Sequence, residues 1–430
     1  MGNGSPPAID FAEANCVAAY RAVRAKVNTE NQLGQGRNLL PPPEALIQHI
    51  SNLIAPLANS NRINDYGTRA DAGDRFSAAT LLNRFLKREA ISADDIFFTT
   101  GTTEAISLTT SYLAGRNYSL RLPLPCYYAF EQSAKRYGAR IAGYYNEAGE
   151  IAPCETSAKQ IAHIQIIPNG VTGRHFLHPG KQSEAYKIVD AVFQIPSQPG
   201  THPVGEPLRE AMKETDLHHG CLMMTASKDL SVPGLRPGLL VTKDPVLKRY
   251  LARDRFERSY SICLIGSQVI LAYLAILNFI DPENTAEDLT GIHRGLPPTS
   301  LSMLPSLAAT ISIVRDLRAM QSRYSQGLTA IRETMDQLAV PFDDYCPSSG
   351  YSLFPQIPTT MTSQKSFTQW CNWMGRRRGL KLNPPVVFGG NDAVWEKLYP
   401  RTSYIRLNCS DEPDIIRKNM ATLIDSIRHA

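Results

Sequence analysis

The stretch "TASKDLSVPGLRPG", residues 225–238, holds a single lysine among small, apolar and turn-forming residues. A lysine that acts as a nucleophile must spend part of its time uncharged, and a partly desolvated loop lowers the pKa of its ammonium group. Lys228 lies in such a loop, and its small neighbours leave room for a flat ligand. The prolines and glycines that follow predict a turn that brings Arg236 towards the same pocket, where a guanidinium suits a phosphate. A lone lysine is more often a solvated side chain, so other segments must decide.

Short apolar runs alternate with amphipathic stretches on both sides of this loop. The amphipathic stretches 103–115 and 127–138 predict helices between strands. Such alternation predicts an α/β domain around a mostly parallel sheet flanked by helices. The apolar runs that we expect to be strands are residues 95–100, 118–125, 140–146, 162–169, 187–195, 221–227 and 238–242.

The most apolar segment, residues 263–280, approaches membrane-spanning length but contains Ser267, Gln268 and Asn278. These polar interruptions favour a buried helix of a large domain over a membrane span. Residues 281–300 have the composition of a connection, and three- and four-residue spacing predicts a long helix over 306–338. A strand, helix, strand, helix pattern then indicates a smaller α+β domain. We therefore predict an N-terminal arm with part of the small domain over 1–65, a large domain over 66–305 and a small C-terminal domain over 306–430.

Charge and cysteine content narrow the kinds of partner. The formal net charge of +5 comes from 45 basic and 40 acidic residues, which suits an anionic small-molecule ligand and predicts neither a nucleic-acid nor a membrane partner. The eight cysteines occur singly, without a Cys-x-x-Cys pair or a zinc spacing. We therefore expect a cytoplasmic protein without a bound metal.

Taken with its neighbours, the lysine loop resembles that of the fold-type-I pyridoxal-phosphate enzymes. The closest resemblance is to the class I/II aminotransferases and relatives such as aminocyclopropane-carboxylate synthases. Their loop reads roughly Ser-x-Ser-Lys followed by Pro-Gly-Leu-Arg-x-Gly, and here Thr225 replaces the first serine. The resemblance implies that Lys228 forms a Schiff base with pyridoxal 5′-phosphate. It also implies that Thr225, Ser227 and Arg236 lie near the cofactor phosphate.

Further segments resemble the family in the same order along nearly the whole chain. "TTGTTEAISL" follows a predicted strand and opens a predicted helix, so that backbone N–H groups and hydroxyls can face a phosphate. "LPCYYAFEQSAKRYGA" resembles the segment whose aromatic stacks on the pyridine ring, and "KIVDAVFQI" the strand whose aspartate binds the protonated pyridine nitrogen. The residues that the resemblance assigns to the cofactor in these segments are Gly101, Thr102, Thr103, Tyr127 and Asp190.

Two more segments concern the substrate and a second subunit. "SYIRLNCS" resembles the strand whose arginine grips the α-carboxylate of the substrate, which makes Arg406 the candidate. "NRINDYGTRADAG" resembles the segment whose tyrosine reaches the phosphate of the neighbouring subunit. Tyr66 therefore implies a homodimer with shared active sites.

The sequence departs from the family where the cofactor oxygen O3′ is bound. Gly170 and Val171 stand where the family has Asn-Pro, and Asn169 lies one residue early. Phe193 replaces the tyrosine that usually follows the aspartate by three residues. Both usual donors to O3′ are thus altered, and such donors lower the pKa of the cofactor imine. We expect the imine to stay protonated over a wider pH range, with Asn169 as the candidate substitute ligand.

The resemblance implies a reaction on an L-α-amino acid through an external aldimine and a Cα carbanion, with Lys228 as the acid and base. An aminotransferase-like reaction is favoured. The altered O3′ contacts leave a lyase, cyclase or γ-replacement enzyme with an S-adenosylmethionine-like substrate open. They leave open, too, an amino-acid oxidase or hydroxylase of specialised metabolism. A non-catalytic cofactor-binding regulator or a degenerate scaffold is disfavoured by the retained Lys228, Asp190 and Arg406.

Overall fold

The computed structural model describes residues 14–25, 33–64, 70–88, 90–154, 160–176, 185–198, 200–258, 262–280, 286–361, 364–400 and 403–428. The chain divides into two compact units. Unit 1 comprises Met1–Gly36, Thr109–Tyr186 and Ser322–Ala430, and unit 2 comprises Arg37–Leu108 and Lys187–Gln321. The domain boundaries at residues 65 and 305 stay a prediction. No helix in the described ranges combines the length and apolar character that crossing a membrane requires.

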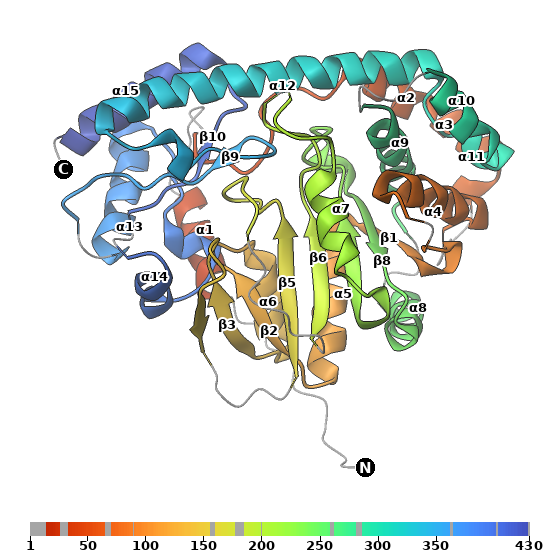
Figure 1. Cartoon of the computed structure of the whole chain (residues 1–430), viewed down its shortest axis with the longest axis horizontal. Coiled ribbons are helices and arrows are strands. Elements are labelled where there is room, and N and C mark those ends of the chain that lie inside the picture. The colour runs from red at the N-terminus through yellow and green to blue at the C-terminus, as the bar shows by residue number, and fades with distance from the viewer. Residues whose placement is uncertain are drawn as a thin grey trace. The chain divides into compact units, whose positions relative to one another are not determined.

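The central sheet has eight strands in the order β1-β8-β7-β6-β5-β2-β3-β4 (Figure 1). Strand β2 runs parallel to β3 and β5, and β6 runs parallel to β7, whereas β8 is antiparallel to β1 and β7. The predicted α/β class and every predicted strand of the large domain are confirmed, and β4 was not foreseen. The strands are β1 (Ile96–Thr100), β2 (Ser119–Pro123), β3 (Ile141–Tyr145), β4 (Ile151–Pro153), β5 (Ile161–Ile167), β6 (Tyr186–Ala191), β7 (Gly220–Met224) and β8 (Pro237–Val241).

The apolar segment of unit 2 forms a buried helix, α9 (Leu264–Ile280), as expected. It packs against α4, β1 and β8 (Figure 1). Its polar residues have partners in the core: the Asn278 amide donates to the Leu81 carbonyl at 2.9 Å. The other helices and 3-10 turns of unit 2 are α2 (Glu44–Asn52), α3 (Ile54–Asn59), η1 (Arg62–Asn64), α4 (Ala72–Leu86), η2 (Ala93–Asp95), α7 (Glu206–Lys213), η3 (Leu217–His219), η4 (Pro233–Leu235) and α8 (Pro245–Arg258).

The segment expected to be a connection contains two helices, α10 (Ala286–Arg294) and α11 (Pro298–Leu301). Its prolines suggested a loop, but proline is tolerated in the first turn of a helix, where its missing N–H group has no partner to lose. Pro298 is the first residue of α11, and Pro297 caps the helix directly before it. The long helix that follows, α12 (Leu307–Met335), confirms the helical prediction for 306–338.

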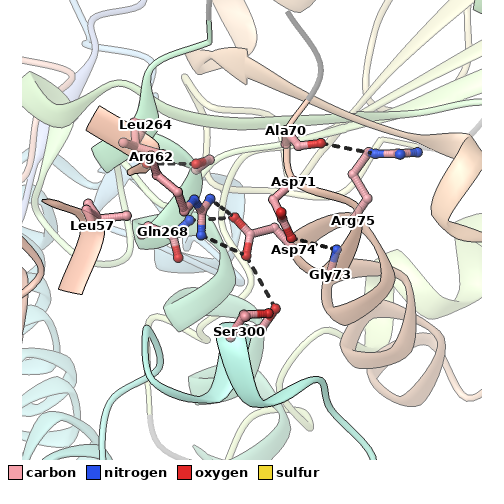
Figure 2. A network of polar contacts seen from close by, with 12 residues as sticks. Leu57, Arg62, Ala70, Asp71, Gly73, Asp74, Arg75, Leu264, Gln268 and Ser300 are labelled. Carbon is pink, nitrogen blue, oxygen red and sulfur yellow. Dashed lines mark hydrogen bonds and ion pairs between the residues drawn. The ribbon is translucent and has the colours of Figure 1, made fainter. Parts of the chain in front are cut away.

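A buried carboxylate joins four elements of unit 2. Asp74 on α4 has no exposed surface, and its carboxylate accepts hydrogen bonds from Arg62, from Gln268 Nε2 at 2.7 Å and from Ser300 Oγ at 3.3 Å. Figure 2 shows these three side chains pointing towards it from η1, α9 and α11. Gln268, one of the polar interruptions that argued against a membrane span, therefore has a structural role in the core.

The C-terminal part of unit 1 confirms the predicted strand, helix, strand, helix pattern. A short antiparallel sheet pairs Leu407 with Leu353 and Asn408 with Ser352. Trp395 is fully buried and its ring contacts those of Phe354 and Tyr399. The elements are β9 (Ser352–Leu353), η6 (Phe342–Asp344), α13 (Gln364–Trp373), a π-helical turn η7 (Met374–Arg378), η8 (Pro385–Phe388), α14 (Asp392–Leu398), β10 (Leu407–Asn408) and α15 (Pro413–Arg428). Others in the chain are α1 (Asn15–Ala25), α5 (Gly101–Gly115), α6 (Tyr128–Tyr137) and η5 (Asp336–Leu338).

Candidate functional site

The lysine loop of unit 2 begins where β7 ends, and hydrogen bonds tie it to the start of β8. Thr225 Oγ1 lies 2.7 Å from the Pro237 carbonyl oxygen, to which it donates, and 2.9 Å from Ser227 Oγ. The backbone N–H of Ser227 donates to the same Oγ1 at 3.1 Å. Lys228 is half-buried and lies at the centre of the turn. Thr225 thus fixes the backbone on which the lysine is carried.

Arg236 follows η4 with a left-handed backbone, φ 52°, and its guanidinium lies over the first turn of α5. Its Nη2 donates to Thr103 Oγ1 at 3.3 Å. A Cβ added at Gly101 would lie 2.8 Å from that Nη2, so only glycine leaves the guanidinium its place. The next strand approaches equally closely, because a Cβ at Gly238 would lie 2.6 Å from the Cα of Gly101.

The beginning of α5 suits an anion. The first backbone N–H groups of a helix have no partner within the helix, and the helix dipole adds partial positive charge there. Gly101 opens α5, and Thr102 and Thr103 follow in its first turn, both half-buried. With Arg236 close by, these residues could form a cradle that holds a phosphate group. The structure therefore brings together Gly101, Thr103 and Arg236, as the resemblance implies.

Asp190 on β6 is a buried acid, and one of its carboxyl oxygens lacks a hydrogen-bond donor in the described structure. It lies opposite Met223 of the parallel strand β7, which leads directly into the lysine loop. Its side chain is 2% exposed, and in the described structure its Oδ1 has no hydrogen-bond partner. Burial raises the pKa of the Asp190 carboxyl to about 7. A cationic donor from a ligand could pair with such a carboxylate and offset the cost of burying it.

These groups fit pyridoxal 5′-phosphate. Asp190 offers an unsatisfied acceptor for a protonated pyridine nitrogen, and the cradle of α5 and Arg236 offers charge and donors for the phosphate. Lys228 lies on the loop between the strand beside Asp190 and the turn that carries Arg236. Phe193, two residues beyond β6, is 2% exposed and carries no hydroxyl for O3′. All of these residues belong to unit 2.

Unit 1 holds the candidate carboxylate-binding arginine. Arg406 is 8% exposed, its Nε donates to the Gly34 carbonyl at 3.1 Å, and its guanidinium lies 5.0 Å from the Phe388 ring. Burial lowers its pKa, and the phenols of Tyr20, Tyr351 and Tyr127 oppose that shift. Among the described residues, the groups that oppose the shift of its pKa are therefore phenols. A buried guanidinium in this setting favours an anionic ligand.

Sequence reasoning missed several residues around Arg406. A Cβ at Gly36 would lie 2.5 Å from Arg406 Nη1, so the guanidinium needs a glycine there. The amide of Asn383 donates to the same Gly34 carbonyl as Arg406 does. The two glycines of "LGQGR", residues 33–37, were the available signal, because closely spaced glycines often mark a close approach of backbone to another group.

The side chain of Asn169, in unit 1, forms hydrogen bonds with the backbone of the turn in which it lies and with a neighbouring segment. Its Oδ1 accepts from the backbone N–H groups of Val171 at 2.9 Å and Thr172 at 3.4 Å, and its Nδ2 donates to the Pro125 carbonyl at 2.7 Å. The oxygen and one N–H of the amide are therefore engaged with backbone, and its role towards O3′ stays a prediction. Tyr127, two residues after Pro125, contacts the ring of Tyr128 at 4.7 Å. Tyr66 lies outside the described residues.

No family model matches the chain, and no curated protein matches it. Solved structures do resemble it over nearly its whole length. An aminotransferase from Neisseria meningitidis is 14% identical with a TM-score of 0.69, covering 97% of this chain and 98% of its own. An aminotransferase from Mycobacterium tuberculosis (12%, 0.67) and a tyrosine aminotransferase from Leishmania infantum (13%, 0.65) cover 98% of both chains. The chain has the fold of the aminotransferases, which confirms the fold class that the resemblance implies.

Proposed function

We propose that the protein is a pyridoxal-phosphate-dependent enzyme that acts at the Cα of an L-α-amino acid, with an aminotransferase-like reaction. The observation that carries the proposal is Asp190, a buried carboxyl with an unpartnered oxygen, on the strand next to the lysine loop. The phosphate cradle at Gly101, Thr103 and Arg236 lies in the same unit. Burial of a carboxyl oxygen without a donor is costly, and a ligand with a cationic donor would offset that cost.

Several residues of unit 2 together would hold the cofactor. When bound, the cofactor accepts the negative charge that develops at Cα of the substrate. Asp190 keeps a proton on the pyridine nitrogen by pairing with it. Arg236 and the first turn of α5 bind the phosphate, with Thr103 fixing the guanidinium. The Lys228 amine would hold the cofactor at its aldehyde group. Thr225 and Ser227 keep the backbone of the loop in place.

Proton transfer and substrate orientation follow from the remaining assignments. With the cofactor bound, the Lys228 amine would remove the proton from Cα of the substrate and return it. Arg406 binds the α-carboxylate in two parallel hydrogen bonds, and the bond from its Nε to Gly34 fixes the plane of the guanidinium. Tyr127 supplies an aromatic face for the pyridine ring.

A second candidate reaction is supported by Phe193 and the turn at Asn169. The side chain of Phe193 has no hydroxyl, and the Asn169 amide is engaged with three backbone groups. The alteration of both usual O3′ donors is compatible with a lyase, cyclase or γ-replacement enzyme acting on an S-adenosylmethionine-like substrate. It is equally compatible with an amino-acid oxidase or hydroxylase of specialised metabolism.

The assembly and location of the protein belong to the same proposal. A homodimer is supported by large apolar side chains that are exposed on unit 2, and Tyr66 would complete the partner's site. A cytoplasmic location is supported by eight free cysteines. The exposed apolar residues of unit 2 are Ile47, Ile54, Ile63, Phe76 and Ile311, which are 40%, 54%, 48%, 47% and 48% exposed.

Reconstitution with pyridoxal phosphate tests the proposal. The wild-type protein should develop the absorbance of a bound, covalently linked cofactor, and Lys228→Ala should not. Lys243→Ala, a half-buried lysine of the same unit, serves as the matched control and should behave as the wild type. Equal spectra for Lys228→Ala and Lys243→Ala would refute the assignment. Keto-acid formation that depends on an added amino acceptor then separates transamination from the second candidate.

A further inference from the structure

The residue after Lys228 is a buried acid with two specific partners. Asp229 is 5% exposed, and its Oδ2 accepts the backbone N–H of Gln194 at 2.8 Å and the phenol O–H of Tyr273 at 2.5 Å. The backbone of Ile195 adds a further hydrogen bond to the same carboxylate. Charge-assisted hydrogen bonds of this kind are stronger than neutral ones, especially when solvent is excluded.

The carboxylate connects two segments that leave the sheet. Strands β6 and β7 are paired as far as Ala191 and Met224, and beyond that point the ladder no longer holds them together. Gln194 lies three residues past β6 and four past Asp190, whereas Asp229 lies five past β7. The bond from Gln194 to Asp229 therefore continues the connection between the Asp190 strand and the lysine loop.

Tyr273 anchors this connection to the core. It lies on α9, has no exposed surface, and its pKa is raised by burial and by Asp229, so that the phenol stays protonated and donates. Burial raises the pKa of Asp229 itself to about 6, and the bonds from Tyr273 and the backbone oppose that shift. Removing the phenol hydroxyl would leave a buried carboxylate short of one donor, which costs more than a surface hydrogen bond would.

We propose that Asp229 and Tyr273 are positioning residues that hold the Lys228 loop against the segment following Asp190. The inference rests on the proposed function. A rigid, flat cofactor must be bound at two ends at once, by the Lys228 amine and by the Asp190 carboxylate. If the backbones of Lys228 and Asp190 can move relative to each other, a cofactor bound at one of these residues is misaligned with the other. Asp229 touches neither cofactor nor substrate in this role, and acts through the backbone of Lys228.

The test uses Tyr273→Phe, Asp229→Asn and the matched control Tyr145→Phe. Tyr145 is also a fully buried phenol, and its hydroxyl donates to the Ile164 carbonyl at 2.7 Å in unit 1. Each protein is titrated with pyridoxal phosphate, the linkage is reduced with borohydride, and labelled Lys228 is quantified by mass spectrometry. The pH midpoint of the cofactor absorbance and the free energy of unfolding of the cofactor-free protein are measured in parallel.

We expect Tyr273→Phe to weaken covalent capture at Lys228 by on the order of tenfold and to shift the pH midpoint. Tyr145→Phe should lower the free energy of unfolding by about as much as Tyr273→Phe does. It should leave covalent capture at Lys228 and the pH midpoint of the cofactor absorbance unchanged. Asp229→Asn, which keeps one acceptor oxygen but no charge, should fall between wild type and Tyr273→Phe if geometry matters most.

Two results would overturn the inference while the proposed function stands. One is unchanged capture and midpoint in Tyr273→Phe, and the other is an equal loss in Tyr273→Phe and Tyr145→Phe, which would mean a general effect of stability. Failure of the wild-type protein to capture the cofactor at Lys228 would instead refute both the proposed function and the positioning role.

Discussion

Asp190→Asn should stabilise the cofactor-free protein at alkaline pH, although it removes a residue proposed to bind the cofactor. Burial raises the pKa of this carboxyl from its ordinary value of 3.8 to about 7. Between these two values the folded chain binds more protons than the unfolded chain, so the free energy of unfolding decreases as the pH rises. The stability that the protonated Asp190 carboxyl contributes is fully present below its pKa in the unfolded chain. It is lost as the pH rises through its pKa in the folded chain.

The size of the effect follows from the shift in pKa. One pKa unit corresponds to about 1.4 kcal/mol, so a carboxyl raised to about 7 costs the wild-type protein about 4 kcal/mol once it is ionised. Asparagine has nearly the same shape and carries no charge at any pH. The stability gap in favour of Asp190→Asn should therefore widen by about 2 kcal/mol between pH of about 5.5 and about 8.5.

Urea unfolding of the cofactor-free proteins at these two pH values measures the gap. Asp343→Asn is the control, because this residue is exposed and its carboxylate meets solvent in both states. If Asp190→Asn and the wild-type protein lose stability in parallel, Asp190 is not an unpaired buried acid, and the main argument for the cofactor is refuted. With the cofactor added the sign should reverse, because only the wild-type carboxylate pairs with the pyridine nitrogen.

Three further substitutions test the site and its support. Arg236→Gln should weaken binding of pyridoxal phosphate by roughly tenfold to a hundredfold in equilibrium titration and barely affect pyridoxal, which lacks the phosphate; equal losses would contradict the phosphate role. Phe193→Tyr should lower the pH midpoint of the cofactor absorbance, because a phenol donor stabilises the charged O3′; an unchanged midpoint in spectral titration would count against it. Asp74→Ala removes the acceptor of Arg62 and Gln268 and should lower the free energy of unfolding by about 3–5 kcal/mol in the same urea assay. The control Glu412→Ala breaks an exposed ion pair with Arg323 and should lower it by about 1 kcal/mol or less.

The sheet strands and the lysine loop could be predicted because their signals are local. A run such as residues 187–195 is apolar enough to identify a buried strand, and glycine and proline fix a turn through their own backbone limits. The helices α10 and α11 within the expected connection were not foreseen, because composition does not tell a loop from a short helix, and α11 even begins with proline. The positions of Pro297 and Pro298 decide this, and they depend on the register of the helix.

The surroundings of Arg406 could not be predicted, because they come from segments far apart in sequence. Gly34 lies 372 residues before Arg406, yet its carbonyl accepts the arginine Nε. Tyr20 and Phe388 reach the same guanidinium from α1 and η8. Apart from the two glycines within residues 33–37, no local sequence pattern carries information about such contacts. The same holds for Tyr273 and Asp229, which are 44 residues apart and meet only in the folded core.

The close packing of Gly101 against Gly238 has a consequence for how the loop tolerates mutation. The contacts at Gly238 include the backbone of Gly101, so no rotamer can relieve a side chain placed there. This constraint belongs to the fold and would persist in a descendant that had lost all activity. A library randomised over residues 225–238 should therefore deplete Gly238 variants in a screen for folded protein, and Lys228 variants only in a selection for turnover. The two screens would then separate residues that are constrained by folding from residues that are constrained by catalysis within the fourteen residues 225–238.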